Sequence, residues 1–386
     1  MYISRLVVKN WRNFTNVDVP LKEIVYIAGV NASGKSNFLD IFRFLRDIVT
    51  RGGGLQKAVD DRGGVPKIRC LAARQHSAVK LEVELKKDLT SEVADWSYCL
   101  SFHDSSRIKQ QGARVVSEIV KKNGETILDR SRESEEDKKD PWRLTQTHLE
   151  QIGSNQKFRE IAEFFKEVLY LHLVPQLLRH GNQLAVKKME SDPFGQGFLE
   201  MVAVTPEKTR ANRLKRINEI LQNAVPELHD LTLEKDESGN PHLEILFKNW
   251  RATGARQRED QFSDGTLRLI ALLWSLMSTN NLILLEEPEL SLHGAVIEQI
   301  PSLFLKTKNS RKKSGGQIFV STHSERLLSD KSIDASACLI VSPRKKGEAS
   351  RVEMLNDMEL NMVRMGMSSP ADLIFPKTEA AIGRLF

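Results

Sequence analysis

The residues best suited to chemistry stand at positions 29–36, in the order Gly-Val-Asn-Ala-Ser-Gly-Lys-Ser. An apolar run at 24–28 precedes them and an amphipathic segment at 37–45 follows, which predicts a buried strand, a glycine loop and a helix. In such a loop, backbone N–H groups and the helix N-terminus bind the phosphates of a nucleoside triphosphate. Lys35 is placed to reach the β- and γ-phosphates, and Ser36 to ligate Mg²⁺. The residues predicted to contact the nucleotide are Gly29, Asn31, Ser33, Gly34, Lys35, Ser36 and Asn37.

Two carboxylates, Glu286 and Glu287, follow a second apolar run at 282–285. The carboxyl end of a buried parallel strand is where α/β proteins bind their ligands. We expect Glu286 to hold the Mg²⁺ shell, directly or through water, and Glu287 to act as a general base on an attacking water. Adjacent surface glutamates are common, but four aliphatic residues before this pair and Pro288 after it favour a site.

A histidine, His323, comes just after another apolar strand at 317–320. It is placed to hydrogen-bond the γ-phosphate and the attacking water, and a structural histidine is the alternative. The segment 262–268 (Phe-Ser-Asp-Gly-Thr-Leu-Arg) opens an apolar helix at 269–277, and Ser263, Gly265 and Thr266 would form a second anion site there. The chain has one phosphate loop, so the economical ligand for this second site is a γ-phosphate held by another copy.

Near the N-terminus, a strand at 3–8 leads into a polar and aromatic turn at 9–14. Arg12 is expected to face the phosphates, and Trp11 or Phe14 the base. Burial of both aromatic residues in the core is the alternative.

Composition sets broad limits on the class of protein. The 386 residues, 40% of them hydrophobic, suffice for two domains or for one large domain with an insertion. The net charge of +6 permits contact with nucleic acid without requiring it. Three cysteines without a CxxC pair argue against a zinc site or disulfides. No apolar run reaches the roughly 18–20 residues of a membrane span, so we expect a cytoplasmic protein that does not bind membranes.

Alternating residues predict antiparallel strands at 79–85, 96–102 and 115–120, with a hairpin turn at 122–125. The charged segment 129–141 is expected to be an exposed loop. Helices are predicted from 158 and over 198–225, a strand at 170–176, and a strand pair at 231–234 and 243–247. Short apolar strands at 24–28, 282–285, 317–320 and 337–341, interleaved with helices, indicate an α/β fold with a parallel sheet buried on both faces. The sequence contains no long heptad run, so we expect no long coiled coil.

The four stretches with chemistry resemble, in order and type, the ABC-type ATPases of the RecF/SMC-like and OLD-like branch. More narrowly, the chain resembles bacterial predicted ATPases that carry an AAA-type label and are related to phage abortive-infection ATPases. The resemblance covers residues 1–50 and 255–345 well and the middle poorly. It implies a P-loop NTPase with an ABC-type head: a mixed and partly parallel core sheet flanked by helices, an antiparallel β-subdomain and a helical lobe. The implied domains are an ATPase core at 1–175 and 256–345 with a β-rich insertion at about 78–157, a helical lobe at 176–255, and a C-terminal extension at 346–386.

The resemblance also assigns roles to residues. Residues 29–36 match the Walker A loop, Ser263 to Arg268 the signature, and His323 the switch histidine. Glu286 takes the Walker B position, where Asp is usual, and Glu287 that of the catalytic glutamate. Gln176 matches a Q-loop residue that ligates Mg²⁺ or water, with Gln110, Gln111 and Gln183 as competitors, and His293 would lie near a dimer seam.

The implied activity is hydrolysis of ATP by a homodimer or higher oligomer in which two chains, arranged head to tail, enclose two ATP molecules. Such a switch would serve DNA maintenance or anti-phage defence with a separately encoded effector. The alternative is a clamp that holds DNA or RNA and is gated by ATP, with a groove of basic residues. These are Lys121, Lys122, Arg213, Lys215, Arg216 and the run 306–313, for which an ordinary solvated surface is the competing interpretation. A P-loop kinase is disfavoured because the signature and His323 would have no role in it. A transporter subunit is disfavoured by the signature and by the arrangement of the N-terminal strands.

Overall fold

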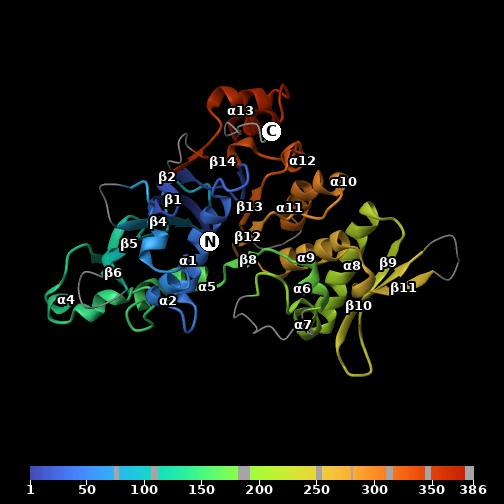
Figure 1. The fold of residues 1–386 in the computed structure, drawn as a ribbon, viewed down its shortest axis with the longest axis horizontal. Coiled ribbons are helices and arrows are strands. Elements are labelled where there is room, and N and C mark those ends of the chain that lie inside the picture. The colour runs from blue at the N-terminus through green and yellow to red at the C-terminus, as the bar shows by residue number, and fades with distance from the viewer. Residues whose placement is uncertain are drawn as a thin grey trace, which may run out of the picture. The chain divides into compact units, whose positions relative to one another are not determined.

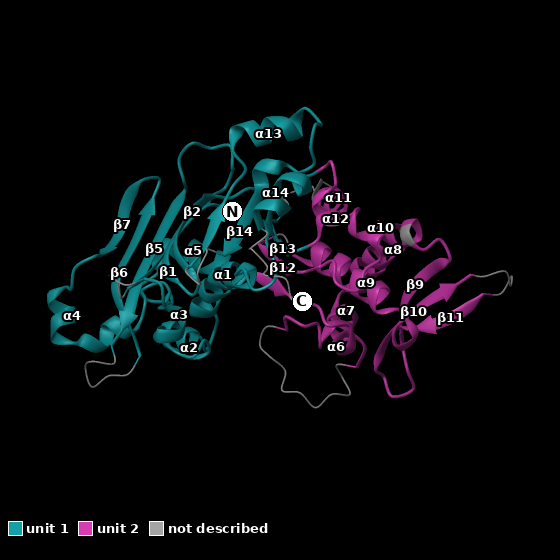
Figure 2. Cartoon of the chain, turned by 45° about the horizontal axis from the view of Figure 1, so that its top comes forward, with its two compact units in different colours: residues 1–168, 316–323, 333–386 teal, residues 169–315, 324–332 magenta. Residues whose placement is uncertain are grey.

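The computed structural model describes residues 1–73, 78–105, 112–180, 192–248, 254–279, 281–309, 316–343 and 349–378 (Figure 1). The chain forms two compact units (Figure 2). Unit 1 comprises Met1–Val168, Gly316–His323 and Ile333–Phe386, and unit 2 comprises Leu169–Gly315 and Ser324–Ser332. These units are divided by compactness, whereas the expected domain limits came from the family resemblance, so the expected limits stay a prediction.

Unit 1 is built on a mixed sheet whose strands lie in the order β7-β6-β5-β4-β1-β2-β15-β14-β3-β13. The strands are β1 (Tyr2–Trp11), β2 (Phe14–Pro20), β3 (Ile24–Ala28), β4 (Val79–Lys86), β5 (Trp96–Asp104), β6 (Ala113–Lys122), β7 (Glu125–Arg130), β13 (Ile318–Thr322), β14 (Cys338–Pro343) and β15 (Ser350–Glu353). Strands β13 and β14 both pair with β3 in parallel, whereas β1, β4, β5, β6 and β7 pair antiparallel. The parallel centre and the antiparallel wing were both expected.

The helices of unit 1 are α1 (Lys35–Val49), α2 (Leu55–Asp60), α3 (Val65–Ile68), α4 (Glu135–Lys139), α5 (Arg159–Lys166), α13 (Asp357–Arg364) and α14 (Pro370–Thr378). Helix α1 packs against β13 and α5. Phe42 of α1 meets Phe319 of β13 at 5.0 Å between ring centroids, and Phe44 meets Trp11 at 5.1 Å. Each such buried ring contributes roughly 1.5–3 kcal/mol, so the helix that begins at the phosphate loop is anchored firmly in the core.

Unit 2 contains a parallel pair of short strands, β8 (Leu169–Leu171) and β12 (Ile283–Glu286), and an antiparallel sheet of β9 (Leu228–Lys235), β10 (Pro241–Phe247) and β11 (Ala255–Arg258). Its helices are α6 (Pro175–His180), α7 (Phe198–Val204), α8 (Glu207–Ala224), α9 (Asp264–Ser278), α10 (Gly294–Ile297), α11 (Ile300–Asn309) and α12 (Glu325–Leu328). Helix α9 is apolar around most of its circumference because it packs against α6, α8 and α11.

Several predicted elements need correction. The strand expected at 170–176 ends at Leu171, and Pro175 starts helix α6, since proline suits the first turn of a helix. The helix expected over 198–225 is broken at Thr205 and Pro206 into α7 and α8. Strands β2 and β15 were not predicted.

The charged segment 129–141 was expected to be an exposed loop: most of it is exposed, but it is not a loop throughout. It contains helix α4, which Ser134 and Asp137 start with a reciprocal capping box. Asp137 is buried and pairs with the Arg130 guanidinium at 3.2 Å. The capping box and this ion pair both stabilise the short helix.

Other expectations hold. The strand at 24–28 is confirmed. The predicted hairpin turn is confirmed as well, and its residues Asn123 and Gly124 both have a positive φ. All three cysteines are free thiols. In the described part of the chain the 18-residue α8 is the longest helix, and none is of the length and apolarity that crossing a membrane requires.

Candidate functional site

The phosphate loop lies in unit 1 between β3 and α1. Gly34, at φ 113°, is the residue just before the helix, and the Phe38 N–H donates to its carbonyl at 3.0 Å. The Lys35 ammonium donates to the carbonyl oxygens of Gly29 at 2.9 Å and Val30 at 3.2 Å. The loop thus curls around the ammonium group of Lys35, at the N-terminus of a 15-residue helix. This is the geometry that binds an anion.

Gly34 has no acceptable substitute in this setting. A Cβ atom there would lie 2.0 Å from Nδ2 of Asn13, and the positive φ already disfavours an L side chain.

His323 leaves its strand at the same edge of the sheet as the loop. Strand β13 runs parallel to β3 with Thr322 opposite Ala28, and His323 and Gly29 are the next residues of the two strands. Both belong to unit 1. This register places His323 next to the start of the glycine loop.

The two carboxylates lie in unit 2. Glu286 is the last residue of β12, and its carboxylate accepts a hydrogen bond from the hydroxyl of Tyr170 in β8. Glu287 follows with φ 45°, a left-handed conformation rare for a non-glycine residue. Its carbonyl begins a turn that closes at the Leu290 N–H at 3.2 Å.

The signature segment opens helix α9 of unit 2 as predicted. The Ser263 Oγ accepts from the Thr266 N–H at 3.1 Å and lies 2.8 Å from its hydroxyl. A Cβ on Gly265 would come within 2.6 Å of the Ser291 carbonyl, so the segment after β12 packs directly on the signature. Arg179 holds the other side by donating to Asp264 at 2.9 Å.

Arg268 connects the signature helix to the carboxylate segment. It is 4% exposed and donates to the carbonyl oxygens of Leu290 at 3.2 Å and Glu287 at 3.4 Å. Burial lowers its pKa, and the charges of Glu289 and Glu287 oppose this.

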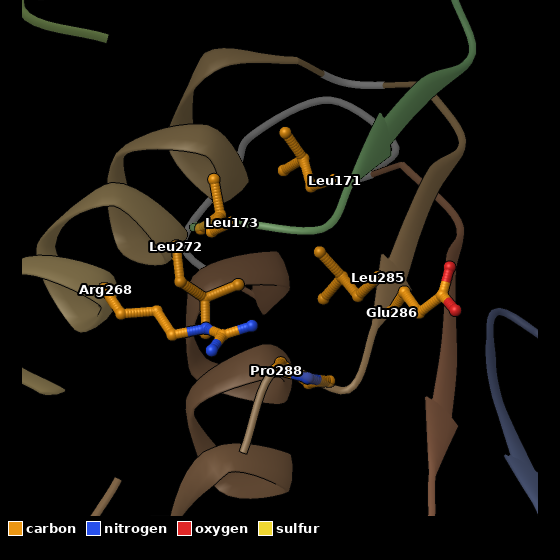
Figure 3. Close-up of a pocket in the computed structure, with 7 residues that line it drawn as sticks. All are labelled: Leu171, Leu173, Arg268, Leu272, Leu285, Glu286 and Pro288. Atoms are coloured by element: carbon orange, nitrogen blue, oxygen red, sulfur yellow. The ribbon is translucent and has the colours of Figure 1, made fainter. Parts of the chain in front are cut away.

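The same arginine lines a small, mostly apolar pocket, and Figure 3 shows its guanidinium reaching toward Pro288 while the Glu286 carboxylate points away. The other lining residues are Leu171, Leu173, Leu272 and Leu285.

For Trp11 and Phe14 the sequence left two alternatives, contact with the base or burial in the core, and the structure decides between them. Both aromatic side chains are fully buried, so the core alternative is the correct one and neither faces a base. The Arg12 guanidinium donates to the Asp40 carboxylate of α1 at 2.8 Å. Its predicted contact with phosphates stays a prediction.

Asp40 is the centre of a buried ionic cluster beneath the loop helix. The Arg62 guanidinium donates to both of its carboxylate oxygens at 2.9–3.1 Å, and Arg43 lies 3.9 Å away. Burial raises the pKa of Asp40, but Arg62, followed by Arg12 and Arg43, outweighs it and holds the pKa below 3.8. The carboxylate therefore stays ionised and ties the first strands to α1.

Two further predicted residues, Gln176 and His293, belong to unit 2. Gln176 is exposed on α6 of unit 2, and its proposed competitors Gln110, Gln111 and Gln183 lie outside the described residues. His293 is exposed and caps α10.

The residues of the predicted basic groove are divided between the two units, and the groove stays a prediction. Lys121 and Lys122 belong to unit 1, whereas Arg213, Lys215 and Arg216 belong to unit 2. Arg213 stacks over Trp274 at 5.3 Å, and the run 306–313 lies partly outside the described residues.

The donors fit the expected cofactors. Hydroxyl and carboxylate oxygens, as in Ser36 and Glu286, are the ligands Mg²⁺ prefers, and Tyr170 orients the carboxylate as outer partners of a metal ligand do. No group of three or more His, Cys, Asp or Glu side chains suited to a metal occurs among the described residues. Sequence reasoning missed Tyr170, and it gave Arg268 no role of its own although it lies inside the signature motif.

Comparison with known proteins identifies the family and the fold. The sequence model of the family described as "AAA domain, putative AbiEii toxin, Type IV TA system" matches residues 24–329, more than half of the chain. No curated protein matches. The chain is similar to an SMC head solved with the C-winged helix domain of ScpA, at 14% identity and a TM-score of 0.55, covering 92% of this chain and 98% of that one. The SMC head domain from Thermotoga maritima matches at 12% identity and a TM-score of 0.49, covering 92% and 100%.

The fold is therefore that of an ABC-type ATPase head of the SMC kind, with an α/β architecture as expected. The chain belongs to the AAA-domain family of AbiEii type. Membership of this ATPase family implies that the chain binds a nucleotide.

Proposed function

We propose that this chain binds ATP with Mg²⁺ and hydrolyses it. Lys35 and the loop N–H groups bind the phosphates, Ser36 and Glu286 hold the metal, Glu287 activates the water and His323 contacts the γ-phosphate. Bound Mg²⁺ would neutralise charge on the phosphates. The observation that carries the proposal is the curled loop at the N-terminus of α1, with His323 following the strand next to it. Gln176 and Arg12 are proposed as further ligands of water and phosphate.

The assembly proposed is a head-to-tail dimer with two ATP molecules at its interface. The support is the signature turn: Ser263 is exposed at the start of the 15-residue helix α9, and Thr266 is held against it. A helix N-terminus of this length is suited to an anion. In a dimer it would meet the γ-phosphate bound by the partner, and His293 would lie near the seam.

The role we propose is an ATP-gated conformational switch in anti-phage defence or DNA maintenance, acting with a separately encoded effector. The support is the family description, which names an AbiEii toxin and a toxin–antitoxin system. A toxin–antitoxin system has two components, and a switch that acts on a separately encoded effector would also need a second protein.

The test of hydrolysis is phosphate release from ATP by the wild type, Lys35→Ala and Glu287→Gln. The proposal predicts turnover that needs Mg²⁺ and is lost in both variants. Lys35→Ala should also lose nucleotide binding, whereas Glu287→Gln should keep it. Wild-type binding without turnover, under any Mg²⁺ concentration, would contradict hydrolysis.

The test of the head-to-tail arrangement is complementation between two inactive chains. Lys35→Ala has a damaged loop and Ser263→Arg a damaged signature. In a mixed dimer one composite site combines the intact loop of one chain with the intact signature of the other. Turnover should return on mixing the two variants. A mixture as inactive as its components, although mixed dimers form, would contradict the arrangement.

A further inference from the structure

The carbonyl of Ser33, inside the phosphate loop, is held by two side chains that come from opposite ends of the chain. The Asn13 Nδ2 donates to it at 2.8 Å, and the Ser350 hydroxyl donates to it at 2.6 Å. Asn13 stands in the turn between β1 and β2, and Ser350 begins β15.

The donors and acceptors of this cluster match one another. The Asn13 Nδ2 has two hydrogens: one goes to the Ser33 carbonyl, and the other goes to the Ser350 Oγ at 2.7 Å. The Asn13 Oδ1 accepts from the Asn37 Nδ2 at 2.9 Å, which fixes the orientation of the amide. The Ser350 N–H also donates to the Asn13 carbonyl at 2.7 Å.

This arrangement sets the direction of the next N–H group in the loop. In a trans peptide the C=O and the following N–H point in opposite directions, so a Ser33 carbonyl held toward Asn13 and Ser350 directs the Gly34 N–H the other way. The structure contains no cis peptide in the described residues. Gly34 has a positive φ of 113°, which glycine adopts without steric cost.

The turn that carries Asn13 is itself fixed to the loop helix. The Trp11 Nε1 donates to the Asn37 carbonyl at 3.0 Å, and Arg12 pairs with Asp40. Ser350 is 7% exposed. The two donors are therefore presented by rigid surroundings.

We propose that Asn13 and Ser350 are positioning residues of the nucleotide site: they hold the Ser33–Gly34 peptide so that its N–H faces the phosphates before ATP arrives. The inference rests on the proposed function, which it deepens. Both residues lie outside residues 24–329 that define the family match. The strand that follows β14 thus belongs to the phosphate-binding apparatus, and an event that displaces β15 would weaken nucleotide binding.

The experiment measures the Kd of a fluorescent ATP analogue and the kinetics of phosphate release for Asn13→Ala, Ser350→Ala, the double variant and Ser350→Thr. Asn16→Ala is the matched control, because Asn16 is exposed on the same hairpin. We expect each alanine variant to raise Kd and KM about five- to tenfold, with kcat at saturating ATP within about twofold of wild type. The effects should be less than multiplicative in the double variant, because the two side chains also bond each other. Ser350→Thr, which keeps the hydroxyl, should bind more tightly than Ser350→Ala.

Wild-type Kd values in both folded alanine variants would overturn the inference while leaving the proposed function intact. Binding by the wild type that is also unaffected by Lys35→Ala would overturn the proposed function and the inference with it. A purely structural role would lower thermal stability without nucleotide and leave Kd unchanged in the folded fraction, which also overturns it. If Asn13→Ala fails to fold, the comparison of Ser350→Ala with Ser350→Thr decides the question.

Discussion

The Arg268 guanidinium of α9 donates to the backbone carbonyl of Glu287, 3.4 Å away, and to that of Leu290, 3.2 Å away. These carbonyls bracket the turn at the end of β12, where Glu287 adopts a left-handed conformation. Such a conformation costs of order 1–3 kcal/mol and persists only when its surroundings enforce it. Arg268 therefore holds the proposed catalytic glutamate in place from the signature helix of the same unit.

Replacing Arg268 by lysine should reduce turnover more than nucleotide binding. A lysine ammonium is a point charge without the planar fork that spans these two carbonyls, so we expect Glu287 to lose its fixed backbone. We expect kcat for phosphate release to fall about tenfold or more, with Kd for ATP changed less than about threefold. Arg213→Lys is the control, since Arg213 packs on the same helix over Trp274 without contacting the carboxylate segment. Equal losses of kcat in the two variants would contradict this role.

Removing the hydroxyl of Tyr170 should weaken the use of Mg²⁺. The hydroxyl donates to the Glu286 carboxylate, and outer partners of a metal ligand typically contribute 10- to 100-fold in affinity or activity. Tyr170→Phe should therefore raise the Mg²⁺ concentration for half-maximal turnover about tenfold. Binding of nucleotide without Mg²⁺ serves as the internal control and should not change. An unaltered Mg²⁺ dependence would contradict the role of Tyr170 in orienting a metal ligand.

The ionic cluster at Asp40 should make unit 1 sensitive to acid. Its folded-state pKa lies below the ordinary value of 3.8, so the stabilisation is present in full above pH 3.8 and is lost as pH falls from there through the folded-state value. Asp40→Asn should lower the free energy of unfolding at neutral pH by about 3–5 kcal/mol, because Arg62 is left buried without its partner.

The measurement for this prediction is chemical unfolding of wild type, Asp40→Asn and Asp18→Asn between pH 3 and 7. Asp18 pairs with Arg5 at 2.8 Å, but both side chains are nearly half exposed, so its loss should cost at most about 1 kcal/mol. The Asp40 variant should also show a flatter pH dependence below pH 4. Equal effects of the two substitutions would contradict a buried cluster.

The site was predictable where its signals are local. Strand, glycine loop and helix lie within residues 24–49, and Ser263 caps the helix that follows it, so the order of residue types is enough to place them. The same holds for the strand before Glu286, whose aliphatic residues indicate burial on both faces.

Contacts between distant residues were beyond the reach of sequence reasoning. Asn13 and Ser350 are 337 positions apart, and Tyr170 and Glu286 are 116 apart. Nothing in the local sequence marks Ser350, which lies at the start of the short strand β15. The core position of Trp11 was one of two open alternatives, and only the packing against Phe44 decides between them.

The measurement that tests the central claim most directly is the solution mass of wild type and Glu287→Gln, each with and without ATP and Mg²⁺. The account predicts that ATP converts monomers into dimers, and that Glu287→Gln keeps them as dimers because it cannot hydrolyse the nucleotide that joins them. Lys35→Ala should stay monomeric under all conditions. A mass that does not respond to ATP in either wild type or Glu287→Gln would contradict an ATP-gated switch.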